Sequence, residues 1–278
     1  MTAPLAVPPA VNAGAIRAAF AAVPREAFVG PPPWQLYGRG ALLREFSIDP
    51  ADLYEDVLVA LDAAKGINNG SPSLHARMLE LLAVAPGDSV LHVGAGTGYY
   101  SAILAELAGA QGHVTAVEFD AALAAAARQT LRPWPQVEVF HADGATFPRA
   151  PVQRIYVSFA VAEPAAAWLD GLVVGGTLVV PLGVPDARSR GGERNFSGRC
   201  AVLAVTRARR GLAASFAMPA AFICAEGPTA GDPALRAALW AAFGRGGLER
   251  VQSLIRGPAD PHRSWMTSAR FSLGFDPP

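Results

Sequence analysis

The amino-acid sequence predicts an α/β protein whose core is a doubly wound, mostly parallel β-sheet. From residue 86 onward, short apolar runs alternate with segments of helical periodicity, as in 89–93, 99–107, 113–117 and 121–131. Strands that alternate with helices indicate parallel strands joined by helical crossovers. Further along, the β-rich runs 199–207 and 214–224 follow one another without a helix between them. We therefore expect an antiparallel hairpin at one edge of the sheet.

The other expected elements follow from the same periodicities and from helix boundary signals. Pro24 should end or kink a helix over 12–28, and residues 29–52, which include three consecutive prolines, should form an irregular arm. A loop over 65–72 should lead into a helix that begins at Pro72 with Ser71 as its N-cap. The remaining expected segments are a loose start over 1–12, strands over 137–140, 154–158 and 177–181, a helix over 163–172, a flexible basic loop over 183–198, a helix over 233–243, and strands over 250–255 and 268–275.

Composition and charge narrow the class of protein. The chain has 278 residues, 23 basic and 23 acidic side chains, and 51% hydrophobic residues. A balanced charge argues against a nucleic-acid partner, which would need a basic surface. No apolar run of about 18 residues and no basic-flanked leader occur, so we expect a cytoplasmic protein without a membrane span. Only Cys200 and Cys224 are present, and both lie in apolar runs, so we expect buried thiols and no metal site.

The sharpest local pattern is a glycine-rich turn between an expected strand and an expected helix. Gly94, Gly96 and Gly98 alternate with Ala95 and Thr97, and Tyr99 opens the helix. Glycines in such a turn let a ligand approach main-chain N–H groups. A dinucleotide fingerprint spaces its glycines as G-x-G-x-x-G, which would require a glycine at Tyr99. The alternating spacing therefore favours S-adenosylmethionine over a dinucleotide, and a nicotinamide oxidoreductase becomes a distant alternative.

Two acidic residues extend this pattern in the expected order. Glu118 follows the run HVTAV, where its carboxylate could accept hydrogen bonds from two ribose hydroxyls, and Phe119 comes next. Alternatively, Glu118 is simply a carboxylate at a helix N-terminus. Asp143 could accept from an adenine amino group, with Gly144 permitting close approach, unless the pair is an ordinary Asp-Gly turn. Together with the glycine turn, these residues predict a cofactor site.

Several further segments resemble one family. Val23–Phe28 reads VPREAF, Leu53–Asp56 reads LYED, and Gly175–Gly183 reads GGTLVVPLG. With the glycine motif, these segments resemble the protein-L-isoaspartate O-methyltransferase family of class I methyltransferases. The resemblance runs from about Val23 to Ile223 and implies a seven-stranded Rossmann-like sheet. Three parts are then expected: an N-terminal helical arm with an active-site loop over 1–75, a methyltransferase domain over 76–224, and an α+β extension over 225–278.

The resemblance implies methyl transfer to a carboxylate of a peptide or protein, with S-adenosyl-L-methionine as donor. The family places a serine beside the reaction centre in a segment that corresponds to Gly66–Pro72. Here the serine position falls on Gly70, and the hydroxyl stands one place later at Ser71. Ser71 and Asn69 are therefore the expected catalytic residues, although Ser71 could equally act as a helix cap, and Asn68 is an alternative polar contact.

Two histidines stand near this expected site. His92 occupies a place where class I enzymes commonly carry an acidic residue that holds the ammonium group of the cofactor. A neutral His92 would accept a hydrogen bond from the ammonium group, and a protonated one would repel it. Alternatively, His92 is a packed histidine without a role in cofactor binding. His75 is expected on a helix surface rather than as a base. Trp240 is expected to pack, and Trp265 and Arg270 to line a cleft or a dimer contact.

Three functions stay open at this point. The first is a carboxyl methyltransferase acting on isoaspartyl residues, as the resemblance implies. The second is an O-methyltransferase of the same fold that acts on another peptide or on a small molecule, which the altered 65–72 segment and the extra C-terminal residues favour. The third is a non-catalytic cofactor-binding or interaction protein. The sequence does not indicate an oligomeric state.

Overall fold

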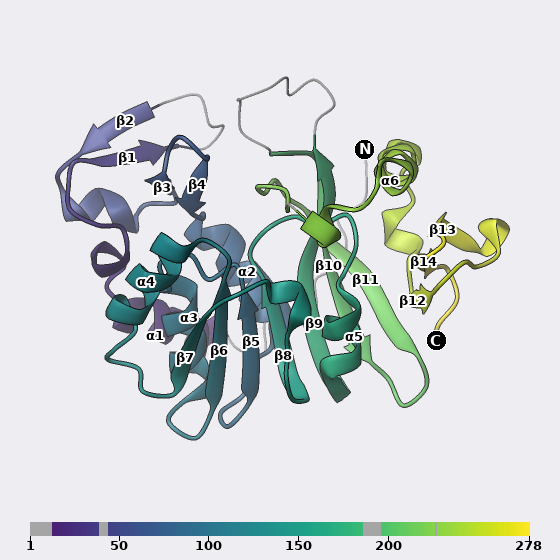
Figure 1. The fold of residues 1–278 in the computed structure, drawn as a ribbon, viewed down its shortest axis with the longest axis horizontal. Helices are drawn as coiled ribbons and strands as arrows, with labels where there is room; N and C mark the ends of the chain where they lie inside the picture. Colours follow the sequence, from purple (N-terminus) through teal and green to yellow (C-terminus); the bar gives the residue numbers. More distant parts are fainter. Residues whose placement is uncertain (1–12, 39–43, 186–195, 226) are drawn as a thin grey trace. The chain divides into compact units, whose positions relative to one another are not determined.

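A computed structural model describes residues 13–38, 44–185, 196–225 and 227–278 (Figure 1). The described residues form two compact units, one over 13–144 and one over 145–278. The seven strands from β5 to β11 divide between the units, three in the first and four in the second. The predicted loose start over 1–12 and residues 186–195 of the predicted basic loop lie outside the described residues.

The first unit starts with a helix and a small antiparallel sheet. Helix α1 (Ala13–Ala22) ends two residues before Pro24, and a short 3-10 helix (Arg25–Phe28) follows. The sheet has the strand order β2-β1-β3-β4. Its strands are β1 (Trp34–Tyr37), β2 (Arg44–Ser47), β3 (Leu58–Asp62) and β4 (Ile67–Asn69), with a 3-10 helix (Pro50–Tyr54) between β2 and β3.

This sheet corrects two expectations. The arm over 29–52 is not irregular, since it holds β1 and β2, and the loop over 65–72 contains β4. These strands are three or four residues long, so none of them shows enough alternation to be recognised from its own sequence. Their stability comes from pairing and from a shared apolar cluster, which includes Trp34, Leu53 and Val59. The N-terminal part is therefore mixed α and β rather than helical.

The rest of the first unit is a parallel sheet with its crossover helices. Strands β5 (Ser89–Val93), β6 (His113–Glu118) and β7 (Val137–His141) pair in parallel in this order. Helix α3 (Tyr99–Ala108) contacts all three strands, and nine of its ten residues are buried. Asp120 is the N-cap of helix α4 (Ala121–Thr130), and its carboxylate accepts from the N–H groups of Ala122 and Leu123. Helix α2 (Pro72–Leu82) precedes β5, and Ser71 is its N-cap, as predicted.

The second unit continues the α/β pattern and then becomes antiparallel. Strand β8 (Val152–Val157) pairs in parallel with β9 (Leu172–Pro185), and helix α5 (Ala166–Gly171) connects them. Strand β10 (Ser197–Arg207) pairs antiparallel with both β9 and β11 (Leu212–Pro219). The predicted antiparallel hairpin is thus confirmed, although its second strand begins and ends earlier than the pattern 214–224 indicated.

The C-terminal residues form the α+β extension that the sequence predicted. Helix α6 (Pro233–Arg245) is followed by β12 (Ser253–Arg256), β13 (Ser264–Thr267) and β14 (Phe271–Gly274). Strand β12 pairs antiparallel with β11, so the extension lengthens the sheet of the second unit (Figure 1). Strand β13 was not expected. Within the residues that the structure describes, no helix has the length and apolar character needed to cross a membrane.

Candidate functional site

The glycine turn follows β5 and opens α3, where the sequence placed it. Gly94, Gly96 and Gly98 have φ angles of 79°, 58° and 98°, a region that side chains disfavour. The N–H groups of Gly94 and Ala95 donate to the carbonyl of Val117, which ties the turn to the neighbouring strand β6. The turn is therefore fixed in shape and leads directly into the N-terminus of α3.

Glu118 is the side chain that faces this turn. One carboxylate oxygen accepts from the N–H of Gly96 at 2.8 Å, and the other accepts from the N–H of Asp120 at 2.9 Å. The residue is 8% exposed, and this burial raises the pKa of its carboxyl group, while the backbone hydrogen bonds oppose the shift. The structure thus brings Glu118 and the glycine turn together, as the sequence predicted. The N-cap of the following helix α4 is Asp120 and not Glu118.

The other predicted cofactor residues lie at neighbouring strand ends. Phe119 follows Glu118 and is 73% exposed, which is unusual for a large apolar side chain. Asp143 is exposed just after β7, and the N–H of Ala142 donates to the carbonyl of Glu118. Gly144 is buried, and a β carbon there would lie 2.2 Å from Cγ1 of Val93. The close approach at Gly144 is therefore to strand β5.

Thr97 and Tyr99 support the turn from within the protein. The Thr97 hydroxyl donates to the carbonyl of Phe28 at 2.6 Å, and the Thr130 hydroxyl donates to the carbonyl of Thr97 at the same distance. Tyr99 is 3% exposed, and its ring meets Phe28 edge to face with centroids 5.6 Å apart. These two residues hold the turn against the VPREAF segment.

His92 is a buried, neutral histidine. It is 1% exposed, and burial lowers its pKa to about 3. Its Nδ1 lies 2.7 Å from the hydroxyl oxygen of Ser101 on α3. Of the alternatives for this position, the geometry favours the packed histidine, and its low pKa removes the repulsion that a protonated ring would cause.

The two expected catalytic residues have different surroundings. Ser71 is half-buried, and its hydroxyl donates to Asp56 at 2.5 Å while accepting from the N–H of Leu74 at 3.4 Å. Asp56 also accepts from the hydroxyl and the N–H of Ser73. Asn69 is 5% exposed, and its side-chain oxygen accepts from Nε of Arg25 at 3.0 Å. Ser71 therefore lies in a small acidic and hydroxyl cluster, whereas Asn69 takes part in a buried network.

Arg25 is the centre of that buried network, and the sequence did not single it out as functional. Its guanidinium is 1% exposed and donates to the carbonyls of Leu53, Val57, Asn69 and Gly70. Burial lowers its pKa. The sequence could have indicated Arg25, because it lies in the VPREAF segment that resembles the family. Asp56 lies in the LYED segment, which also resembles the family, and it was missed as well.

His75 is not on a surface, contrary to the expectation. It is 3% exposed on α2, and its ring stacks on Tyr100 with centroids 3.7 Å apart and planes 8° from parallel. Burial lowers its pKa to about 3. The expectation was wrong because the His75 ring stacks on Tyr100 of another helix, α3, and periodicity within one helix does not reveal such a contact.

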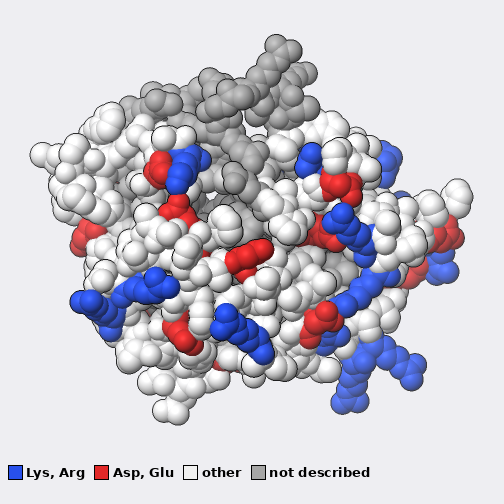
Figure 2. Space-filling view, in the orientation of Figure 1, with Lys and Arg blue, Asp and Glu red and all other residues white. Residues whose placement is uncertain are grey.

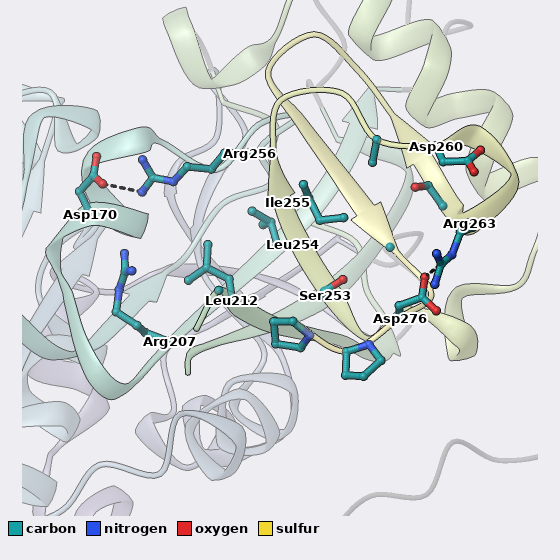
Figure 3. Close-up of a pocket in the computed structure, with 16 residues that line it drawn as sticks. Asp170, Arg207, Leu212, Ser253, Leu254, Ile255, Arg256, Asp260, Arg263 and Asp276 are labelled. Atoms are coloured by element: carbon teal, nitrogen blue, oxygen red, sulfur yellow. Dashed lines mark hydrogen bonds and ion pairs between the residues drawn. The ribbon is translucent and has the colours of Figure 1, made fainter. Parts of the chain in front are cut away.

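A separate cavity of about 560 Å³ is lined by the C-terminal extension and by residues of α5, β10 and β11, among them Asp170, Arg207 and Leu212 (Figure 3). Two ion pairs lie in its wall, Arg256 with Asp170 and Arg263 with Asp276. It holds none of the predicted site residues. Trp265 and Arg270 do not line it either: Trp265 is buried against Phe216 and Phe243, and Arg270 forms ion pairs with Glu163 and Asp232.

Trp240 packs as expected, because the Arg199 guanidinium lies over its ring at 4.2 Å.

Cys200 and Cys224 are buried free thiols, as predicted, and burial raises the pKa of each to about 12. Among the described residues, no group of three or more His, Cys, Asp or Glu side chains could hold a metal ion. Figure 2 shows acidic and basic side chains scattered over the face in view.

Comparisons with known proteins agree with the motifs. The family model described as protein-L-isoaspartate(D-aspartate) O-methyltransferase matches residues 9–190. A protein-L-isoaspartate O-methyltransferase of Aeropyrum pernix is 41% identical over 138 residues, which cover 48% of this chain and 52% of that protein. The chain thus spans about half the length of this relative.

Solved structures show the same fold. A protein-L-isoaspartate O-methyltransferase structure has a TM-score of 0.64 and 25% identity, covering 78% of this chain and 62% of that one. A Plasmodium falciparum protein described as a beta-aspartate methyltransferase, in complex with S-adenosyl-L-homocysteine, has a TM-score of 0.52 and 16% identity, covering 62% of this chain and 81% of that one. The matched family model covers well over half of the sequence and includes the VPREAF segment, the glycine turn and Glu118. This chain belongs to the protein-L-isoaspartate(D-aspartate) O-methyltransferase family.

Proposed function

We propose that this protein transfers a methyl group from S-adenosyl-L-methionine to the side-chain carboxylate of isoaspartyl residues in peptides or proteins. The observation that carries the proposal is the Glu118 carboxylate, which is buried and locked against the glycine turn of a chain that belongs to this family. A protein related by fold binds S-adenosyl-L-homocysteine, which supports the choice of cofactor.

The residues around the turn fit such a cofactor. Each Glu118 oxygen accepts one backbone N–H, and a carboxylate oxygen has a further lone pair that can accept from a ribose hydroxyl. The backbone of 94–98 would border the cofactor, and the exposed side chains of Phe119 and Asp143 follow the neighbouring strands β6 and β7, where they would border its base. When bound, S-adenosyl-L-methionine supplies a methyl group on a positively charged sulfur.

The acceptor requires little acid–base chemistry from the protein. A carboxylate is ionised near pH 7 and can attack a methyl group directly. The work left to the protein is to align the acceptor and to exclude water. Ser71 is the better-placed candidate for contacting the acceptor, because the Asn69 side chain is bound to Arg25.

A pair of peptides tests the proposal. One peptide carries an isoaspartyl residue, and the other carries the ordinary aspartyl residue in the same sequence. With methyl-labelled S-adenosyl-L-methionine, we expect base-labile methyl ester on the isoaspartyl peptide alone. Equal labelling of both peptides, or label on neither while the cofactor binds, would reject isoaspartate as the acceptor.

A second candidate is an O-methyltransferase with another peptide or a small molecule as acceptor. Two observations favour it: position 70 has no side chain, and the Ser71 hydroxyl already donates to Asp56. Label that appears on components of a small-molecule extract, and not on the isoaspartyl peptide, would support this candidate. Cofactor binding without turnover on any extract would instead indicate a non-catalytic protein. The absence of a nucleic-acid partner is a further proposal, based on the balanced charge of the sequence. A cytoplasmic location and the absence of a membrane partner are also proposals, based on a sequence that has no apolar run of about 18 residues.

A further inference from the structure

The space beside Gly70 is filled by the side chain of His75. A β carbon built on Gly70 would lie 2.2 Å from Nε2 of His75 and 2.8 Å from its Cδ2. His75 cannot easily give way, because it is 3% exposed and its ring is stacked on Tyr100. With His75 in this place, position 70 accommodates only glycine.

Tyr100 links His75 to the backbone that carries Ser71. Its hydroxyl donates to the carbonyl of Gly70 at 2.7 Å, and Arg25 donates to the same carbonyl at 3.0 Å. The N–H of His75 also donates to the carbonyl of Ser71 at 3.1 Å, within the first turn of α2. His75 therefore contacts this loop directly through its main-chain N–H and through its ring at Gly70. It also contacts the loop indirectly, through Tyr100.

We propose that His75 is a positioning residue of the methyl-transfer site, which fills the side-chain space of position 70 and, through Tyr100, fixes the loop that presents Ser71. This proposal rests on the proposed function, because it assigns the loop to the acceptor side of the site. It also makes positions 70 and 75 interdependent. A side chain at position 70 requires a small residue at position 75. With Gly70 and His75 present, the loop has its hydroxyl at Ser71 instead of at position 70.

Four forms of the full chain test the interdependence: the wild type, His75→Ala, Gly70→Ser, and the double variant Gly70→Ser/His75→Ala. We expect each single change to lower kcat/KM for the isoaspartyl peptide by about 10–100-fold, since a displaced loop misaligns the acceptor. Adenosylhomocysteine affinity, measured by calorimetry, should stay within about threefold, because His75 lies outside the glycine turn and Glu118. The double variant should recover much of the loss of Gly70→Ser, because the clash is gone.

Two further variants separate positioning from general stability. His75→Phe keeps a stacked ring, so it should retain more activity than His75→Ala. Tyr100→Phe removes only the hydroxyl that holds Gly70, so it should change kcat or KM even where the fold is intact. The exposed His113→Ala is the matched control and should be unchanged.

The proposal is overturned if His75→Ala and Tyr100→Phe both keep kcat/KM within about twofold of the wild type, or if the double variant is no better than Gly70→Ser. Failure of the proposed function looks different, because the wild type itself would then bind adenosylhomocysteine but not methylate the isoaspartyl peptide. In that case the unfolding free energies of the same four forms test whether positions 70 and 75 depend on each other. If the effects of the two single changes do not add up to that of the double variant, the interdependence is supported, and if they do, it is rejected.

Discussion

Glu118 carries the cofactor assignment at the residue scale, so its replacement should have a specific effect. If Glu118 accepts from two ribose hydroxyls as proposed, Glu118→Ala removes their acceptor, and we expect adenosylhomocysteine to bind about 1–3 kcal/mol more weakly. Isothermal titration calorimetry measures this directly. Glu138→Ala on the neighbouring strand β7, where the glutamate is exposed, is the matched control. Equal affinity for Glu118→Ala and for the control would reject the ribose assignment.

The two buried histidines predict how stability depends on pH. Burial lowers the pKa of His75 and of His92 from 6.5 to about 3, so the unfolded chain takes up these protons first as the pH falls. The stability that the neutral rings contribute is therefore complete above pH 6.5 and is lost progressively between 6.5 and about 3. Each histidine should add about 1.4 kcal/mol per pH unit to the slope of the unfolding free energy in this range.

Replacing one of these histidines tests that slope. His92→Gln should make the unfolding free energy, measured in urea at several pH values between 4 and 6.5, depend less steeply on pH by about 1.4 kcal/mol per unit. The exposed His262→Gln serves as the control. A slope for His92→Gln that equals that of the control would mean that His92 takes up a proton in the folded protein.

At the scale of elements, Arg25 holds together segments that are distant in sequence. It joins the 3-10 helix after α1 to the segment before β3 and to the end of β4. A lysine ammonium cannot reproduce this planar set of donors, so Arg25→Lys leaves buried carbonyls without partners. We expect a loss of about 2–4 kcal/mol in the unfolding free energy, measured by urea denaturation.

The matched control for this change is Arg17→Lys, because Arg17 is exposed on α1. An equal, small effect of both variants would show that water or neighbouring groups replace the hydrogen bonds of Arg25. A large effect of Arg25→Lys alone would confirm that the small antiparallel sheet depends on this side chain.

The elements also show what the sequence could and could not predict. Helices with capping residues were placed within a few residues, as at Ser71–Pro72 and at Pro233. The parallel strands were found because each is a buried apolar run, as in Ser89–Val93. The short strands β1, β2 and β4 were missed because three or four residues show too little alternation to be recognised. The burial of His75 was missed because it depends on Tyr100 of another helix.

The same limit applies to the candidate site. The glycine turn follows β5 and Glu118 ends the adjacent parallel strand β6, so their proximity could be predicted. The surroundings of Ser71 could not, because Asp56 and Arg25 reach this loop from separate segments. Periodicity and spacing contain no information on such long-range contacts.

At the scale of the whole molecule, the C-terminal extension is built into the second unit. Trp265 is 3% exposed, and its ring meets Phe216 on β11 and Phe243 on α6 edge to face, with centroids 5.1 Å apart in both cases. Trp265→Ala should therefore lower the unfolding free energy by about 3–5 kcal/mol. Thermal and urea unfolding measure this loss, with the half-buried Trp240→Phe as a milder control. An effect no larger than that of the control would mean that the extension does not contribute to the stability of this unit.

The stability contributed by the C-terminal extension and the cofactor site of residues 94–144 can be studied separately. The family model ends at residue 190, whereas the antiparallel sheet of the second unit continues from β10 through β14. The cofactor assignment depends only on residues 94–144 of the first unit, so it can be tested independently of the extension.

The most direct test of the central claim is a crystal structure with adenosylhomocysteine bound. We expect both ribose hydroxyls to donate to the Glu118 carboxylate, the ligand to lie along the backbone of 94–98, and its sulfur to face the loop that carries Ser71. A ligand bound elsewhere, or one whose ribose makes no contact with Glu118, would contradict the assignment.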